Sequence, residues 1–247
     1  MLGKKPVLER IKEISIISIT LAGCWLSQTP KLLALPQDVI INMLRPIPVF
    51  TITNSEGAPL VASGEKNEKV AGVFISKQDA TGFVERLKKE NPELGKQVKV
   101  VPVSLGEIFQ LSENSAKKDG IVFAYVPSEK QMQQAKQLNP QYQGGVPLFV
   151  ATIGKDGGYL TVKQNNMEMI PFFFEKEQAE QLIAEFKKAQ PQQAKETKIE
   201  VVILEGVIEA LKKNNDEMLK KIVFWPSRES IEFLQQTTNS QSQPPRK

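Results

Sequence analysis

One amphipathic segment occurs twice in this chain, and the second copy begins 99 residues after the first. The first copy runs from residue 74 to 92 and the second from 173 to 191. Two lysines and then a proline end each copy, which places positive charge on the last-turn carbonyls and prevents continuation. The apolar residues follow the i, i+3, i+4, i+7 spacing of a helix that packs through one face. The sequence therefore predicts two equivalent helices, with the apolar stripes Ala80, Phe83, Val84, Leu87 and Ala179, Leu182, Ile183, Phe186.

The elements around these helices repeat with the same offset. Pro48-Val49-Phe50 returns as Pro147-Leu148-Phe149, and Val126-Pro127-Ser128 returns as Trp225-Pro226-Ser227. We therefore expect an α/β fold made of an internally duplicated strand-helix unit, with pseudo-twofold symmetry and a mixed sheet flanked by helices. The two copies are expected at residues 36–138 and 146–236. Residues 237–247 are too polar to bury a core and are expected to form a disordered tail.

Hydroxyl and acidic residues predict where two of the helices begin. Ser76 precedes Asp79 by three residues, and Ser104 precedes Glu107 by three residues. In such a capping box, the hydroxyl and the acid satisfy backbone N–H groups that the helix itself leaves free. We expect one helix to begin just after Ser76 and another just after Ser104.

The first 34 residues have the pattern of a secretory signal peptide. Lysines and arginines precede an apolar run of 13 residues from Ile14 to Leu26, which is too short to span a bilayer. The cleavage site has two alternatives. Leu21 to Cys24 resembles a lipobox, which would lipidate Cys24 and give peripheral membrane association, whereas Ala34 fits ordinary cleavage. In either case the chain is expected in the periplasm.

The composition removes several classes of chemistry. The chain has no histidine, and its one cysteine, Cys24, lies in the leader. A mature chain would therefore lack a disulfide and any Cys/His metal site, and we expect no cofactor. None of the glycine-rich phosphate loops or nucleophile elbows occurs in the sequence, so no catalytic residue is assigned and an enzyme is not expected. The 32 Lys and Arg residues are interspersed with 28 Asp and Glu residues along the chain rather than segregated from them. This distribution of charge does not favour nucleic acid as a partner.

Three consecutive phenylalanines begin at Phe172. On a strand, Phe172 and Phe174 point to one face of the sheet and Phe173 to the other. One interpretation is a sheet covered by helices on both faces. The other is an apolar groove that binds an extended client segment, with Phe74, Phe149 and Trp225 as neighbours of Phe172 and Phe174.

Segments distributed over residues 35–236 resemble one known family. They include PVFTITNSEGAPLVAS, VAGVFISKQDA, LKKENPELGKQVKVVPVSLGEIFQL and IPFFFEKEQ. These segments are similar to the cyanobacterial relatives of the twenty-two-kilodalton component of the chloroplast inner-envelope translocon. The resemblance implies a periplasmic, chaperone-like protein of protein transport or outer-membrane biogenesis, which acts near the outer-membrane β-barrel insertase. It brings no catalytic residue with it.

These observations favour a non-enzymatic protein that binds unfolded or outer-membrane client chains through apolar grooves. Two alternatives stay open. One is an adaptor for the β-barrel insertase, and the other is an enzyme or small-molecule binder with its site at the interface between the repeats.

Overall fold

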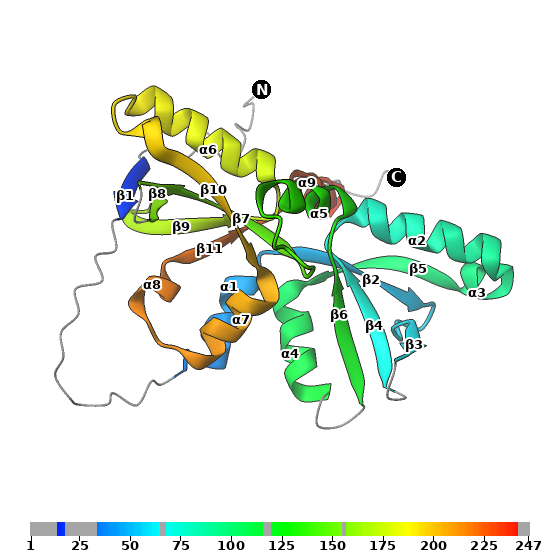
Figure 1. The fold of residues 1–247 in the computed structure, drawn as a ribbon. Helices are drawn as coiled ribbons and strands as arrows, with labels where there is room; N and C mark the ends of the chain where they lie inside the picture. Colours follow the sequence, from blue (N-terminus) through cyan, green and yellow to red (C-terminus); the bar gives the residue numbers. More distant parts are fainter. Residues whose placement is uncertain (1–13, 18–33, 65–67, 116–119, 155–156, 242–247) are drawn as a thin grey trace. The chain divides into compact units, whose positions relative to one another are not determined.

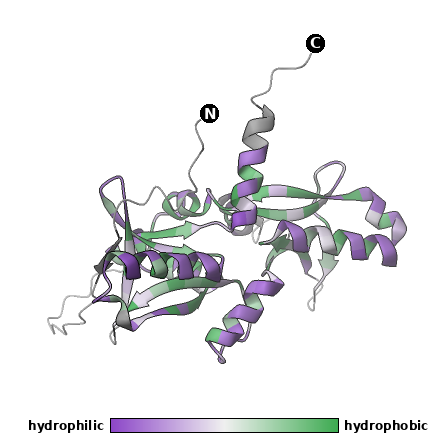
Figure 2. Ribbon diagram, turned by 90° about the horizontal axis from the view of Figure 1, so that it is seen from above, coloured by the Kyte–Doolittle hydropathy of each residue, from purple (hydrophilic) through white to green (hydrophobic). Residues whose placement is uncertain are grey.

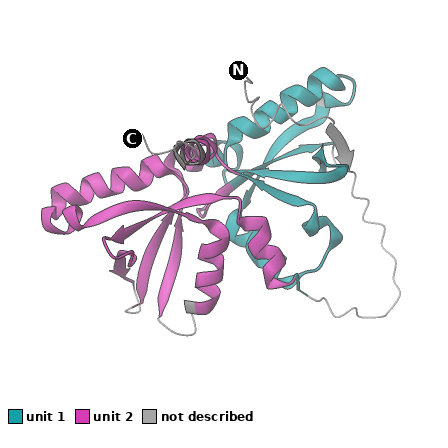
Figure 3. Cartoon of the chain, turned by 180° about the vertical axis from the view of Figure 1, so that it is seen from behind, with its two compact units in different colours: residues 1–35, 135–142, 148–225 teal, residues 36–134, 143–147, 226–247 magenta. Residues whose placement is uncertain are grey.

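The computed structural model describes residues 14–17, 34–64, 68–115, 120–154 and 157–241. The chain divides into two compact units (Figure 3). Unit 1 comprises residues 1–35, 135–142 and 148–225, and unit 2 comprises residues 36–134, 143–147 and 226–247. Each unit contains one mixed sheet with helices beside it, which confirms the predicted α/β class (Figure 1).

The five-stranded sheet of unit 2 is centred on β4, which follows β2 and β3 and precedes the first long helix. β4 pairs antiparallel with β2 and β3 and parallel with β6, and β5 pairs antiparallel with β2. The elements assigned wholly or partly to this unit are α1 (Gln37–Leu44), β2 (Pro48–Asn54), β3 (Val61–Ser63), β4 (Lys69–Phe74), α2 (Lys77–Glu90), α3 (Pro92–Gln97), β5 (Val98–Ser104), α4 (Leu105–Ser115), β6 (Ile121–Val126), α5 (Glu129–Leu138) and α9 (Arg228–Gln241).

Unit 1 repeats this arrangement around β9, which pairs antiparallel with β7 and β8 and parallel with β11. Its sheet has six strands because β1 pairs with β8. The further elements of this unit are β1 (Ile14–Ile17), β7 (Pro147–Ile153), β8 (Gly158–Gln164), β9 (Met167–Phe173), α6 (Lys176–Ala189), the 3₁₀ turn η2 (Ala194–Glu196), β10 (Thr197–Ile203), α7 (Leu204–Lys213), α8 (Glu217–Lys220) and β11 (Ile222–Trp225).

The duplication predicted from the sequence is confirmed in the order and bounds of the elements. Helices α2 and α6 begin and end at positions 99 residues apart, and so do strands β5 and β10. The predicted stripe of α2 contacts the unit 2 sheet, where Ala80 and Val84 join a buried cluster with Phe50, Ile52 and Phe74. Each long helix therefore covers a sheet with the residues that its periodicity indicated.

The last helix of each sequence copy belongs, wholly or in part, to a different compact unit from the strands that precede it in the chain. Helix α9 follows β11 of unit 1 but belongs to unit 2, where the Phe233 ring packs edge-on against Phe50 at 5.6 Å. Glu229 in the first turn of α9 accepts hydrogen bonds from the backbone N–H groups of Lys77 (3.2 Å) and Gln78 (2.8 Å). The C-terminal part of α5, from residue 135, belongs to unit 1 in turn. Unit 2 thus includes a helix that follows the strands of unit 1 in the chain, and unit 1 includes the C-terminal residues of α5.

Both predicted helix starts are confirmed. The Ser76 hydroxyl accepts a hydrogen bond from the Asp79 N–H at 3.1 Å. The Ser104 hydroxyl accepts from the Gly106 N–H at 3.1 Å, while the Ser104 N–H donates to the Glu107 carboxylate at 3.1 Å. The second pair is the reciprocal arrangement that a capping box implies.

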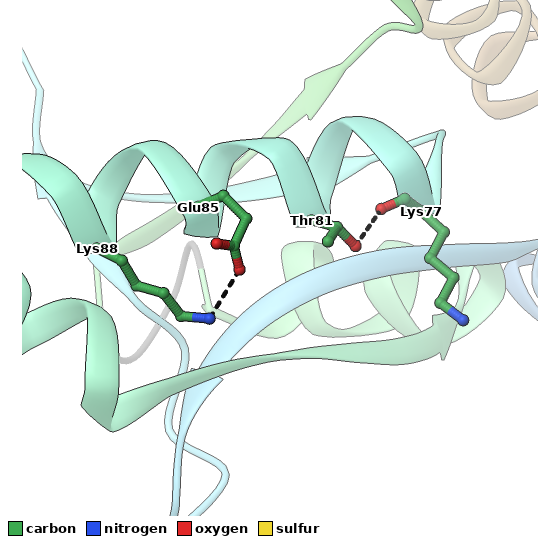
Figure 4. A network of polar contacts seen from close by, with 4 residues as sticks. All are labelled: Lys77, Thr81, Glu85 and Lys88. Atoms are coloured by element: carbon green, nitrogen blue, oxygen red, sulfur yellow. Dashed lines mark hydrogen bonds and ion pairs between the residues drawn. The ribbon is translucent and has the colours of Figure 1, made fainter.

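The outer face of α2 is polar (Figure 2). Along it, the Thr81 hydroxyl donates to the Lys77 carbonyl at 2.8 Å, and Lys88 lies 2.7 Å from the Glu85 carboxylate (Figure 4). Such exposed pairs contribute little to stability, about 0–1 kcal/mol each. The position of the helix is therefore set by its buried side rather than by these contacts.

Regular secondary structure extends into both terminal segments of the sequence. Helix α9 continues to Gln241, five residues into the stretch 237–247 that was expected to be a disordered tail. Adding a residue to an existing helix gains one hydrogen bond per residue fixed, so polar residues extend a helix that they would not start. At the other end, Ile14–Ile17 form β1, and the rest of the predicted leader lies outside the described residues. In the described part of the chain, no helix has the length and apolar character that crossing a membrane requires.

We expect Gly95→Ala to destabilise unit 2, because α3 packs closely on α2 at this residue. A Cβ at Gly95 would lie 2.5 Å from Lys88 Cα and 2.8 Å from Lys88 N, so the two helices must move apart. The cost should be about 1–3 kcal/mol in urea unfolding followed by circular dichroism. Gly82→Ala on α2 is the matched control, since its nearest contact would be the Arg86 side chain at 3.9 Å, and it should stabilise by about 0.5–1 kcal/mol. Equal effects of the two substitutions would contradict the close packing.

A second prediction concerns Asp79, whose carboxylate accepts a hydrogen bond from the Glu129 N–H at 3.3 Å. Burial, followed by the nearby charges of Glu129 and Glu229, raises the pKa of Asp79 above the ordinary value of an aspartate. The native state therefore holds this proton more tightly than the unfolded state, and the ionisation of Asp79 lowers stability as the pH rises through the native pKa. Asp79→Asn keeps an acceptor for the Glu129 N–H but cannot ionise.

The unfolding free energy of Asp79→Asn, relative to the original chain, should consequently increase between about pH 3 and about pH 6. Urea titrations at several pH values measure this difference. A difference that stays flat, or that falls over this range, would refute the raised pKa.

Candidate binding grooves

Unit 1 has an open groove of about 620 Å³. Its lining is apolar except for a phenol and one carboxylate. The strands β8, β9, β10 and β11 and the helices α7 and α8 supply these residues, which are Tyr159, Ile170, Phe172, Val201, Val202, Ile203, Gly206, Val207, Ala210, Asp216, Met218, Leu219 and Ile222. We call it the unit 1 groove.

Two aromatic rings, Tyr159 and Phe172, line the unit 1 groove, and Phe172 also packs against Phe224, which is outside the lining. Phe172 lies 6.4 Å from the Tyr159 ring and 6.3 Å from the Phe224 ring, measured between centroids. Only 5% of the Phe172 surface is exposed. Ile203, at the end of β10, is 38% exposed and lines the groove as well. The groove therefore has a buried aromatic ring and an accessible aliphatic residue in its lining.

Small residues on α7 leave the space that forms this groove. α7 contributes Gly206 and Ala210 to the lining, whereas the positions 99 residues earlier on α4 are Glu107 and Leu111. A Cβ built on Gly206 would meet no atom within 4 Å. Gly206 and Ala210 thus leave the α7 side of the groove open, whereas Glu107 and Leu111 are exposed on α4.

The two ionisable residues of the lining have structural roles. The Asp216 carboxylate caps α8, since it accepts a hydrogen bond from the Met218 N–H at 2.8 Å. Burial, with a smaller contribution from the Glu200 charge, raises the pKa of the Tyr159 phenol above 10.0. The phenol is thus neutral at physiological pH, and the groove presents one carboxylate that is already engaged.

Unit 2 has a smaller apolar groove of about 400 Å³, which we call the unit 2 groove. Helices α2 and α3 form one side of it, and strands β2, β3, β4 and β6 contribute the other residues. The lining consists of Ile52, Leu60, Val61, Ala62, Val70, Gly72, Phe74, Phe83, Leu87, Leu94, Ala124 and Val126. No ionisable side chain is among them.

Small residues again explain the space. Gly72 on β4 pairs with Ala124 on β6, and the equivalent pair in unit 1 is Pro171 and Val223. The next equivalent pairs are Phe74 with Val126, and Phe173 with Trp225. On the covering helix, Leu87 in α2 is only half-buried, whereas Phe186 in α6 is fully buried. Larger side chains fill in unit 1 the volume that is open in unit 2.

The two grooves consequently lie on opposite faces of equivalent sheets. In unit 2 the groove contains Phe74 and lies on the face that α2 covers. The residue equivalent to Phe74 is Phe173, which is fully buried beside Trp225 with 5.8 Å between the ring centroids. The unit 1 groove contains its neighbour Phe172, which points to the other face. Duplication has therefore not produced two copies of one site.

The structure separates the five aromatic residues that the sequence placed in one client site. Phe172 lines the unit 1 groove and Phe74 lines the unit 2 groove. Phe149 and Trp225 belong to the face of Phe173, where Phe149 pairs with Phe173 and is fully buried. Phe174 is 2% exposed and is absent from both linings. The proposed lipidation site, Cys24, lies outside the described residues.

Sequence reasoning missed the residues that determine both grooves, which are Gly206 and Ala210 in one and Gly72 and Ala124 in the other. The available signal was the comparison of the two copies, because the residue 99 positions away in the other copy is larger in each case.

Among the described residues, no group of three or more Cys, Asp or Glu side chains is placed to hold a metal ion.

Comparisons with known proteins identify relatives over most of the chain. A family model described as the Tic22-like family matches residues 2–236. Protein TIC 22-like, chloroplastic, from Arabidopsis thaliana is 27% identical over 206 residues, which cover 78% of this chain and 61% of the relative. Protein TIC 22, chloroplastic, from the same plant is 27% identical over 160 residues, covering 63% of this chain and 56% of the relative. The matched part thus spans less than two thirds of either plant protein.

Two solved structures share the fold. Anabaena Tic22, described as a protein of protein transport, matches with a TM-score of 0.72 and 27% identity, and covers 85% of this chain and 100% of its own. Tic22 from Plasmodium falciparum matches with a TM-score of 0.66 and 24% identity, and covers 81% of this chain and 98% of its own. The second likeness supports the fold alone.

We expect Phe172 to contribute to stability more than Ile203 does, although both line the unit 1 groove. Phe172→Ala removes a nearly buried ring from between two others and should cost about 3–5 kcal/mol in urea unfolding. Ile203→Ala, at a residue that is 38% exposed, should cost less than about 1 kcal/mol. A smaller cost for Phe172→Ala than for Ile203→Ala would show that the aromatic rings are not packed as described.

Proposed function

Because this chain belongs to the Tic22-like family, we propose that it is a non-enzymatic, chaperone-like protein of protein transport that binds unfolded client chains through its two apolar grooves. The observation that carries the proposal is the unit 1 groove, which is large, open and almost wholly apolar. A large exposed apolar surface on a protein typically marks an interaction site or a ligand-binding groove. The likeness to Anabaena Tic22, a protein of protein transport, supports the same role.

The character of the lining favours an extended polypeptide as the ligand. A small polar substrate would need several fixed hydrogen-bonding groups, whereas the unit 1 groove offers a neutral phenol and a carboxylate that caps α8. Apolar side chains of an unfolded chain need no fixed hydrogen-bonding groups. Their burial in the groove contributes a binding free energy of roughly 25 cal/mol per Å² of apolar surface removed from water. Two separate grooves would also hold one long chain more tightly than either groove alone.

We further propose that the protein acts in the periplasm and that its clients are outer-membrane proteins. An exported chain follows from the predicted signal peptide at residues 1–34.

Gly206→Leu tests the proposal by filling the unit 1 groove. A Cβ at Gly206 meets no atom within 4 Å, and leucine favours a helix over glycine by about 0.8 kcal/mol, so the variant should fold and be slightly more stable. We expect it to lose severalfold in its capacity to suppress aggregation of a urea-unfolded outer-membrane barrel protein on dilution, measured by light scattering.

Gly206→Ala is the matched control, because it makes the same change in helix propensity but adds only one methyl group to the groove. It should retain the original capacity. If Gly206→Leu suppresses aggregation as well as Gly206→Ala does, clients do not bind in the unit 1 groove.

A further inference from the structure

Strand β1 lies on the outer edge of the unit 1 sheet. It pairs antiparallel with β8 from Ile14 opposite Val162 to Ile17 opposite Tyr159. Tyr159 also pairs with Thr152 of β7, and Val162 also pairs with Met169 of β9. A strand residue has one partner on each edge, so β1 occupies the edge of β8 opposite to β7 and β9.

The repeated unit does not require this extra strand. In unit 2, β3 takes the place of β8 and pairs antiparallel with β4. Within the described residues β3 has no strand on its other edge, and its three residues are exposed. β1 is therefore an addition to a sheet that is complete without it. An edge of this kind is a template on which another extended segment can pair.

One residue, Tyr159, belongs both to the β8 edge that pairs with β1 and to the unit 1 groove. Tyr159 pairs with Ile17 of β1 and its side chain lines the groove. A segment on this edge would gain main-chain hydrogen bonds from β8, and neighbouring parts of it would have apolar surface beside them. This combination of an added strand and side-chain pockets is a common mode of peptide recognition.

The segment that pairs with β8 indicates what the edge accepts. It has the sequence Ile-Ser-Ile-Ile and lies within the apolar run of the predicted signal peptide. Removal of that peptide would expose the edge. Strands of outer-membrane barrels likewise alternate apolar residues with polar ones and must remain unpaired until they insert.

We propose that the outer edge of β8 is a strand-addition site, which Ile14–Ile17 occupy in the full chain and which an extended, β-branched segment of a client chain occupies in their place. This inference rests on the proposed function, since the client is the same, and it adds the way in which the client binds.

A disulfide that locks β1 in place tests the proposal. Ser15 and Thr161 are directly opposite, and such antiparallel partners have Cα atoms about 4.5–5.5 Å apart, within the range that a disulfide spans. The test uses the full chain with Ser15→Cys, Thr161→Cys and Cys24→Ala. Ser15→Cys with Lys163→Cys is the control, because the β1 register places Ser15 opposite Thr161 and not opposite Lys163, so this pair should form no disulfide.

The probe is a fluorescein-labelled peptide with the sequence of residues 12–19, and its binding is measured by anisotropy. The reduced protein should bind it, the oxidised protein should bind at least tenfold more weakly, and dithiothreitol should restore binding. Equal binding by oxidised and reduced protein would overturn the proposal. So would failure of the Ser15–Thr161 pair to form a disulfide, because β1 would then not lie in this register.

The two proposals fail separately. If locking β1 leaves peptide binding unchanged while Gly206→Leu still loses client protection, only strand addition is wrong. If peptide exchange at β8 occurs but the original chain gives no protection to an unfolded barrel protein, only the proposed function is wrong.

Discussion

How completely the long helix covers one face of its sheet decides whether that face keeps an open groove. Helix α6 buries Leu182, Ile183 and Phe186 against β9 and its neighbours, whereas α2 buries only Ala80 and Val84 completely. The difference arises at paired positions, since Phe186 replaces Leu87 and Trp225 replaces Val126. Interiors pack without voids when side-chain volumes match the space available, so the copy with the smaller residues keeps a groove on this face.

The exchange of terminal helices couples the two copies along the chain. Unit 2 needs α9, because Phe233 packs on Phe50 and Glu229 satisfies the first N–H groups of α2. Those groups would otherwise lack helical partners. Residues 36–138 alone would therefore leave part of the β2 surface and one end of α2 exposed. The sequence copies and the folding units are consequently not the same segments of the chain.

Local patterns predicted the elements well, because helices and their caps depend on residues a few positions apart. Ser76, Ser104 and the two apolar stripes each behave as their spacing indicated. The alternation of Phe172 and Phe173 also placed the two rings on opposite faces. Which face stays open did not follow from these local patterns, because it depends on Gly206 in α7 and on Ala124 in β6, and neither lies near the phenylalanines in sequence. The capping of α2 by Glu229 joins residues about 150 positions apart, so no pattern of neighbouring residues could predict it.

Duplication followed by independent changes in side-chain volume gives the molecule two different surfaces. The unit 1 groove, of about 620 Å³, is bounded by α7 and α8, whereas the unit 2 groove, of about 400 Å³, is bounded by α2 and α3 on the other face of the equivalent sheet. Apolar burial is non-directional and its free energy grows with the area removed from water. The larger groove should therefore accept bulkier apolar side chains without selecting one particular side chain. In the proposed function, the two grooves would then hold different segments of one client. The edge of β8 would fix the direction of the client segment beside Tyr159, because main-chain hydrogen bonding between strands is directional and apolar contact is not.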